Sequence, residues 1–189
     1  MDKTQEEKIL DAAYHCIAKD GYARTSLRQI AQEAGVAVSQ ISYHYTNKEG
    51  LLLAVVARAA QNYHEYMKGF MKEGMTPQEK GEQFITLFQE VLQTDPELFR
   101  VLYDLAGLAL WSEPFRDRVR DVFAGITEQI TTEVFDADVL AELGNEYSAK
   151  TLASMLFGGL FGIAIQALLE PEDVSIRNSL SALSVIFQK

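Results

Sequence analysis

Apolar side chains recur along most of this chain at intervals of three and four residues, which is the spacing of one face of an α-helix. No stretch alternates convincingly between apolar and polar residues at every second position, as a half-buried strand does. The pattern therefore predicts an all-α protein.

The first helix is predicted over residues 4–20. Thr4 and Glu7 have the T-x-x-E spacing of a capping box, and Asp20-Gly21 is a typical helix end. The apolar face of this helix consists of Ile9, Ala12, Ala13, Cys16 and Ile17. We expect it to support the two helices that follow.

The segment Thr25 to Lys48 contains two short helical patterns separated by Gly35. Thr25 is able to cap the first of these helices, and Gly35 provides the permissive backbone of a sharp turn. The apolar stripes are Leu27, Ile30, Ala31 and Ala34 in the first helix, and Val36, Val38 and Ile41 in the second. Two short helices joined through a glycine turn predict a helix-turn-helix.

The outward face of the second helix is polar, as a helix that enters the major groove of DNA requires. The side chains on this face are Ser39, Gln40, Ser42, Tyr43 and His44. Gln40 can make a bidentate contact with an adenine edge, and the two serines can reach bases or phosphates. The alternative is a solvated helix face without a ligand.

The succession T-S-L-R-x-I-A-x-x-A-G-V, a short helix, Y-H-Y and then N-K-E before a long apolar helix resembles the tetracycline-repressor (TetR) family of regulators. The resemblance extends from about Ile9 to Val56. It implies an N-terminal three-helix DNA-binding head, followed by a C-terminal helical bundle for ligand binding and dimerisation.

The resemblance also implies roles for individual residues. Tyr43 and His44 match positions that contact phosphates in relatives, Tyr45 matches a packing aromatic, and Ser42 stands where relatives commonly have a larger residue. Lys48 combines a positive charge with a helix N-terminus, where phosphates bind. The expected DNA-contacting residues are Thr25, Arg28, Ser39, Gln40, Ser42, Tyr43, His44 and Lys48.

The net charge of −10 is unusual for a protein that binds phosphates. Residues 1–50 hold six Lys/Arg and seven Asp/Glu, so nearly all of the excess negative charge belongs to the rest of the chain. We therefore expect a modest salt dependence per protomer, with affinity supplied by a second copy of the head.

The boundary between the predicted domains lies at Asn47, which caps a long helix expected from Lys48 to about Gly74. Residues 1–47 are the predicted DNA-binding domain, and residues 48–189 are the predicted effector-binding and dimerisation domain. Prolines start or interrupt the next predicted helices at Pro77, Pro96 and Pro114. Two further helices are predicted over residues 146–169 and 174–188, which gives about six helices in the body.

Aromatic and sulfur-containing side chains are frequent in this predicted body. Such stripes are more often ordinary core, but relatives of the TetR type bind a small effector among the middle helices. Asp104 lies in an otherwise apolar helix, where it either meets a ligand cation or pairs with an arginine. The candidate pocket residues are Tyr63, Tyr66, Met67, Phe70, Phe88, Phe99, Tyr103, Asp104, Trp111 and Phe123. We expect a mid-sized, largely apolar ligand.

The segment from Thr151 to Leu169 carries no charged residue and is long enough to span a bilayer. Its flanks show no useful positive-inside asymmetry, and Ser154 and Gln166 interrupt the apolar run. We therefore expect no membrane span and interpret the segment as a helix covered by another subunit. The candidate interface residues of a homodimer are Gly158, Phe161, Gly162, Ile165, Leu183 and Phe187.

Several classes of protein and site find no support in the sequence. Cys16 is the only cysteine, so no intramolecular disulfide forms, and the polar N-terminus predicts no secretory signal and a cytoplasmic protein. His15, His44 and His64 are scattered, and neither metal-ligand spacing nor a phosphate-binding glycine loop is present. We expect no metal, no cofactor and no enzyme activity.

These observations predict a ligand-responsive transcriptional regulator. It would bind a double-stranded, palindromic operator as a homodimer and leave it when a small effector binds; activation or co-regulation would use the same parts. The alternative is a helical ligand-binding or adaptor protein that does not bind DNA. The absence of Lys and Arg between Ala37 and Asn47 and the acidic composition favour that alternative.

Overall fold

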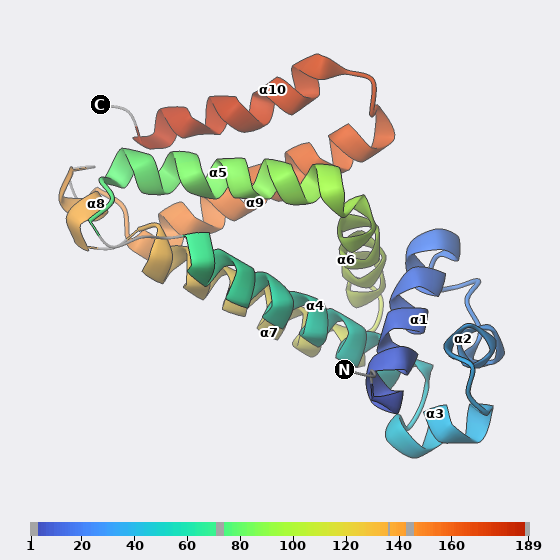
Figure 1. Cartoon of the computed structure of the whole chain (residues 1–189). Helices are drawn as coiled ribbons and strands as arrows, with labels where there is room; N and C mark the ends of the chain where they lie inside the picture. Colours follow the sequence, from blue (N-terminus) through green and yellow to red (C-terminus); the bar gives the residue numbers. More distant parts are fainter. Residues whose placement is uncertain (1–3, 71–73, 136, 143–145, 188–189) are drawn as a thin grey trace. The chain divides into compact units, whose positions relative to one another are not determined.

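This computed structural model describes residues 4–70, 74–135, 137–142 and 146–187, and these residues form helices and the connections between them (Figure 1). Within these ranges, the side chains of residues 62, 63, 65–70, 77, 114, 138 and 142 are not described. The helices are α1 (Gln5–Asp20), α2 (Leu27–Ala34), α3 (Val38–His44), α4 (Lys48–Phe70), α5 (Pro77–Thr94), α6 (Pro96–Ala109), α7 (Glu113–Glu133), α8 (Ala137–Glu142), α9 (Ala149–Leu169), α10 (Val174–Ala182) and the 3-10 helix η1 (Leu183–Phe187). The all-α prediction is confirmed.

The helices form two compact units. The first unit consists of residues 1–61 and 97–120, and the second consists of residues 62–96 and 121–189. Helices α4 and α7 therefore contribute to both units, while α6 belongs to the unit that contains α1–α3. This division describes packing, and the functional boundary between residues 47 and 48 stays a prediction.

The first unit is built around the helix-turn-helix. Ile9, Ile30 and Ile41 come from α1, α2 and α3 and are fully buried, as are Leu51 and Leu52 at the start of α4. Gly35 ends α2 in the left-handed conformation, with φ of 67°, and its N–H donates to the carbonyls of Ala31 and Gln32. The predicted glycine turn between the two short helices is therefore confirmed.

The first helix begins as the sequence predicts, whereas the second does not. Thr4 and Glu7 form a complete capping box at α1. At α2, however, Ser26 is the N-cap and exchanges hydrogen bonds with Gln29. The prediction that Thr25 caps this helix is wrong. Its hydroxyl instead donates to the carbonyl oxygens of Cys16 and Gly21, at 3.1 and 2.9 Å.

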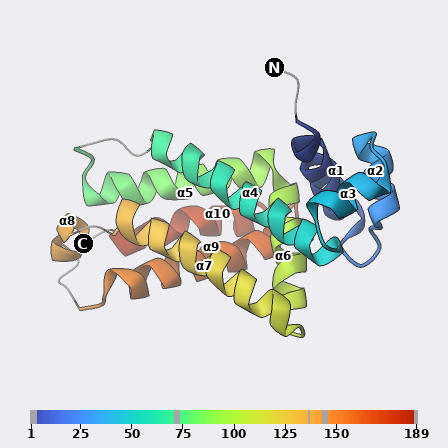
Figure 2. The ribbon, with the colours of Figure 1, turned by 90° about the horizontal axis from the view of Figure 1, so that it is seen from below.

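The second unit packs α5 against α10 and η1, and α10 against α9 (Figures 1 and 2). Phe123 of α7 meets Phe157 and Phe161 of α9 edge to face, with ring centroids 5.3 and 5.5 Å apart. The short helix α8 was not predicted from the sequence. Its six residues are too few for a helical period to stand out.

The last predicted helix has a different end. Its α-helical part stops at Ala182 and continues as the 3-10 helix η1. Phe187 in η1 is buried and stacks on Phe135, with ring centroids 5.4 Å apart. Little of the Phe187 ring is therefore left exposed for the predicted dimer interface, because it is covered within its own protomer.

The contact between η1 and α5 gives a testable prediction. A Cβ added at Gly81 would clash with ring atoms of Phe187, whereas one added at Gly125 in α7 would meet no atom of the described residues within 4 Å. Gly81→Ala should lower the free energy of unfolding by about 1–2 kcal/mol, while Gly125→Ala should raise it by up to about 1 kcal/mol. Denaturant unfolding at one protein concentration measures both. Equal effects of the two substitutions would contradict the close contact.

Candidate nucleic-acid interface

Helix α3 presents a polar face to solvent. Ile41 points into the core, while Ser39, Ser42, Tyr43 and His44 are exposed. Tyr43 has 86% of its surface exposed, and its ring meets that of His44 edge to face at 5.3 Å. The hydroxyl of Ser42 donates to the carbonyl oxygen of Val38 at 3.3 Å. An exposed phenol beside an imidazole can donate hydrogen bonds to phosphate oxygens.

Gln40 has a structural role that was not predicted from the sequence. Its Oε1 accepts a hydrogen bond from the backbone N–H of Ala37 at 2.9 Å, and Ala37 itself has no side-chain acceptor with which to cap α3. Gln40 thus performs the reciprocal half of a capping box. A bidentate contact with adenine would have to share this oxygen with the cap.

The predicted residues of α2 and its preceding connection differ in accessibility. Arg28 is exposed on α2. Neighbouring Arg24 is exposed too, and its Nε donates to the carbonyl oxygen of Asp20 at 2.8 Å. Thr25 is only 3% exposed, and both hydrogen bonds of its hydroxyl seal the end of α1. The Thr25 side chain is therefore not available to a ligand in this structure.

Lys48 is at the start of α4, as predicted, where the side-chain oxygen of Asn47 accepts a hydrogen bond from the N–H of Gly50 at 2.8 Å. The ammonium of Lys48 lies 4.0 Å from the ring centroid of Tyr22 and donates to the carbonyl oxygen of the same residue. Burial lowers the pKa of Lys48, and the nearby carboxylate of Asp104 opposes that effect. The expected phosphate ligand is thus engaged inside its own unit.

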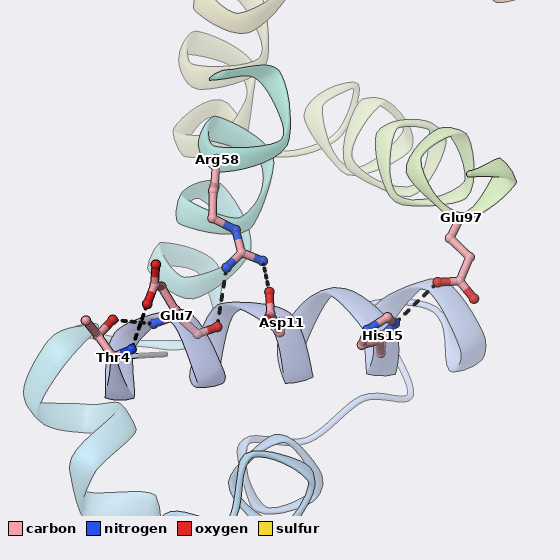
Figure 3. A network of polar contacts seen from close by, with 6 residues as sticks. All are labelled: Thr4, Glu7, Asp11, His15, Arg58 and Glu97. Atoms are coloured by element: carbon pink, nitrogen blue, oxygen red, sulfur yellow. Dashed lines mark hydrogen bonds and ion pairs between the residues drawn. The ribbon is translucent and has the colours of Figure 1, made fainter. Parts of the chain in front are cut away.

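Helix α1 is tied to α4 and α6 within the first unit (Figure 3). Arg58 of α4 forms an ion pair with Asp11 at 2.7 Å, and its Nη1 donates to the carbonyl oxygen of Glu7 at 3.3 Å. Nδ1 of His15 lies 3.4 Å from a carboxylate oxygen of Glu97 on α6. The Arg58 pair is mostly buried, so solvent screens it less than it screens an exposed pair.

Tyr45 follows α3 and is half-buried, in agreement with its expected packing role. Its hydroxyl lies 3.5 Å from a carboxylate oxygen of Glu6 on α1. Burial, together with the charge of Glu6 and the hydrogen bond to it, raises the pKa of Tyr45 to about 12. The phenol therefore stays neutral near pH 7 and anchors the end of α3 to α1.

The candidate pocket residues lie in different parts of the chain. The side chains of Tyr63, Tyr66, Met67 and Phe70 lie outside the described residues. Phe99, Tyr103, Asp104 and Trp111 belong to the first unit, and Phe88 and Phe123 belong to the second. Trp111 is 90% exposed in this structure. Asp104 accepts a hydrogen bond from the backbone N–H of Tyr22, and no ion pair of Asp104 with an arginine is found among the described residues.

Helix α7 contains a polar group that the sequence analysis did not single out. Nε2 of Gln129 is buried and has no hydrogen-bond partner within the part of the chain that the structure describes. A buried donor without a partner destabilises a protein by about 1–3 kcal/mol. No sequence signal distinguishes this glutamine from an exposed one on the same helix.

Helix α9 leaves apolar surface uncovered. Of the candidate interface residues, Gly158 and Ile165 are exposed, Phe161 and Gly162 are partly exposed, and Leu183 lies near Gly159. Two large apolar residues on α9 were not predicted as interface residues, namely Met155 and Leu169, which are 52% and 75% exposed. Met155, Gly158, Gly162, Ile165 and Leu169 recur at three- and four-residue spacing and so form one stripe.

The comparisons with known proteins agree with this arrangement. Residues 9–55 match the family of bacterial regulatory proteins named after tetR. These residues contain most of α1, the helix-turn-helix and the start of α4. Residues 9–55 of the chain belong to the TetR family. The resemblance seen in the sequence is therefore confirmed, and with it an HTH-type transcription regulator rather than an enzyme.

Similar TetR-type chains extend beyond the head. A fatty acid metabolism regulator protein of Bacillus subtilis is 27% identical over 154 residues, which are 80% of this chain and 77% of that protein. RutR, an HTH-type transcriptional regulator of Escherichia coli K12, is 31% identical over 108 residues, 56% of this chain and 50% of that protein.

Solved structures share the fold over nearly the whole chain. FadR, a fatty acid degradation regulator from Bacillus halodurans, has a TM-score of 0.82 at 20% identity, covering 99% of this chain and 96% of that one. FadR from Bacillus subtilis in complex with stearoyl-CoA has a TM-score of 0.80 at 20% identity, with 96% of each chain covered. The TetR-family fold thus includes the body as well as the head.

The capping role of Gln40 can be separated from base recognition. Gln40→Ala removes the acceptor for the Ala37 N–H and should destabilise the protein by about 0.5–1.5 kcal/mol. Gln40→Glu keeps an oxygen at this place and adds a negative charge near a helix N-terminus, so its stability should stay within about 0.5 kcal/mol of the wild type. Denaturant unfolding checks the difference. Equal free energies of unfolding for Gln40→Ala and Gln40→Glu would contradict the capping role.

Proposed function

We propose that this TetR-family regulator is a repressor that binds a palindromic operator as a homodimer and is released by a largely apolar effector. The exposed polar face of α3 within the matched helix-turn-helix carries the DNA-binding part of this proposal. Residues 1–47 would bind DNA, and residues 48–189 would bind the effector and the second protomer. Such an intracellular target implies a cytoplasmic protein.

The contacts with DNA come from two helices in this proposal. Arg28 would approach the backbone from α2, and Tyr43 with His44 would hold phosphates at the end of α3. The base-reading residues would be Ser39, Gln40 and Ser42. We leave Thr25 out of the interface because its hydroxyl is buried and already bonded.

A second protomer accounts for the uncovered stripe on α9. Small residues at Gly158 and Gly162 allow close helix approach, and Met155, Ile165 and Leu169 supply apolar area around them. Two recognition helices roughly 34–36 Å apart, or a multiple of that, would then fit half-sites on one face of the duplex. The dimer would therefore double the few cationic contacts that each head offers.

A membrane is the other conceivable cover for this stripe. Among the described helices, Ala149–Leu169 is long and apolar enough to cross a bilayer, with a mean hydropathy of 2.0 in its most apolar window. Packing helices of soluble proteins pass the same test, and a third of that window is already buried inside the protomer. Similarity of the whole chain to TetR-type regulators supports the protein interface.

For the effector we propose a long-chain fatty acyl thioester. The support is the similarity to a fatty acid metabolism regulator over most of the chain, together with the shared fold of FadR in complex with stearoyl-CoA. A long acyl chain suits the apolar, aromatic-rich body that the sequence indicates. An effector that prefers one body conformation shifts the separation of the heads and so weakens operator binding.

The rival function is a helical ligand-binding or adaptor protein without DNA affinity. Its support is the lack of cationic side chains on α3 and the inward engagement of Lys48. DNA binding itself decides between the two functions.

The DNA shift is the first test of this function. The folded dimer should retard its own upstream DNA at low salt more strongly than random DNA of equal length, and stearoyl-CoA should release it while free CoA at the same concentration should not. An electrophoretic shift with titrated ligand measures both effects. No shift with a folded dimer would overturn the regulator, and a shift that stearoyl-CoA leaves unchanged would overturn the effector class.

Gln129 offers a sharper test of the effector site. We infer that its Nε2 donates to a carbonyl oxygen of the bound effector, since the group is buried and has no partner in the described residues. Gln129→Leu should then weaken stearoyl-CoA binding by about tenfold or more, while the free protein becomes no less stable because an orphaned donor is removed. Calorimetric titration and thermal unfolding give the two values. Unchanged affinity would exclude this contact, and Gln89→Leu on α5, whose amide donates to Ser181 instead, is the matched control.

A further inference from the structure

The connection between α1 and α2 lies against α6 within the first unit. Gly21 at its start has φ of 78°, which L side chains rarely adopt, and a Cβ built there would lie 3.6 Å from Oδ2 of Asp104. The next residue, Tyr22, donates its backbone N–H to the same carboxylate oxygen, across 82 positions of sequence. Helix α6 therefore contacts the connection through which the chain passes from α1 to α2.

Lys48 and Phe115 make three further contacts with Tyr22. Its carbonyl oxygen accepts from the ammonium of Lys48, which also lies over its ring at 4.0 Å. The same ring and that of Phe115 in α7 form a T-shaped pair, with centroids 5.9 Å apart. The N–H, the C=O and the aromatic ring of Tyr22 are thus all held by residues of α4, α6 and α7.

We propose that Asp104 and Lys48 are positioning residues that clamp Tyr22, and thereby set the orientation of α2 and α3 for DNA binding, so that Lys48 is not a phosphate ligand. This proposal rests on the proposed DNA-binding function and names how its head is held. We call the contacts of Tyr22 with Lys48 and Asp104 the Tyr22 clamp.

The two charges of the clamp depend on each other. Lys48 is partly withdrawn from water, and the carboxylate of Asp104 favours its charged form. Asp104 in turn accepts from the Tyr22 N–H, and charge assistance makes such a hydrogen bond stronger than a neutral one. The clamp therefore joins α6 to the start of α4 through one residue of the connection.

The direction in which DNA affinity changes when Asp104 is substituted separates a positioning role from simple electrostatic repulsion of phosphates. Asp104 is negative, so removing its charge should leave DNA affinity unchanged or raise it if attraction to phosphates were all that mattered. If Asp104 positions the head, the same substitution should lower affinity. Asp104→Ala breaks the hydrogen bond, whereas Asp104→Asn keeps an acceptor oxygen for the Tyr22 N–H and serves as the conservative variant.

The salt dependence separates the two roles of Lys48. A phosphate ligand changes the slope of log affinity against log salt concentration by about one when it is lost. Lys48→Met keeps an apolar stem of similar length without the charge, and Lys48→Arg keeps the cation. Arg28→Met on the exposed face of α2 is the comparison for a true phosphate contact.

The experiment combines DNA titrations at several salt concentrations with amide hydrogen exchange of Tyr22 in DNA-free protein. We expect Asp104→Ala and Lys48→Met each to weaken operator binding about tenfold, the effect of losing one charge-assisted hydrogen bond, with the salt slope unchanged. In both variants the Tyr22 amide should exchange faster. Asp104→Asn and Lys48→Arg should restore most of the loss, and the double variant should lose little more than either single one.

Two results would overturn the clamp. In the first, Lys48→Met lowers the slope of log affinity against log salt concentration as much as Arg28→Met does, while the amide hydrogen of Tyr22 exchanges at the wild-type rate. The other is unchanged or increased DNA affinity in Asp104→Ala. Failure of the wild type to bind its upstream DNA would instead refute the proposed function, and the exchange rates, measured without DNA, would still decide whether the clamp exists.

Discussion

The connection of residues 21–26 is the constraint on which the head depends, because every later residue of the helix-turn-helix follows from its path. Thr25 donates to two carbonyl oxygens at the end of α1, and Tyr22 is bonded through both its N–H and its C=O. Ser26 then starts α2 with a capping box. These contacts fix the end of α1 and the start of α2, and the turn at Gly35 then leaves the polar face of α3 exposed.

The acidic composition shapes how such a head can work. Few cationic side chains are exposed near α3, and one of the expected cations is engaged with Tyr22. Affinity must then come from hydrogen bonds, from Arg28 and from a second head brought by the α9 stripe. Dimerisation is for this reason part of DNA recognition, and an effector that alters the body acts on recognition without touching the DNA-contacting residues.

Most of the fold was predictable because the capping and spacing signals of a helix lie within a few residues of one another in the sequence. The capping box of Thr4 and Glu7, the turn at Gly35, the start of α4 at Lys48 and the starts of α5 and α6 at prolines all rest on neighbours within a few residues. The missed helix α8 is too short for a period, and η1 replaces an α-helical end that periodicity alone could not distinguish. The polar face of α3 was predictable from the sequence. Which of the candidate side chains are exposed and which are already bonded within the protein was not predictable.

By itself, the sequence determined the helices, their order and the polar face of α3, since these follow from spacing and capping within one or two turns. Tertiary structure alone decided that the Thr25 hydroxyl is buried, that Lys48 turns towards Tyr22, and that Phe187 is covered within its own protomer. It also decided that Trp111 is exposed and that Asp104 meets the α1–α2 connection. The physical reason is separation along the chain. Each of these outcomes depends on how helices pack, and no local pattern records which distant backbone group or ring will be the neighbour.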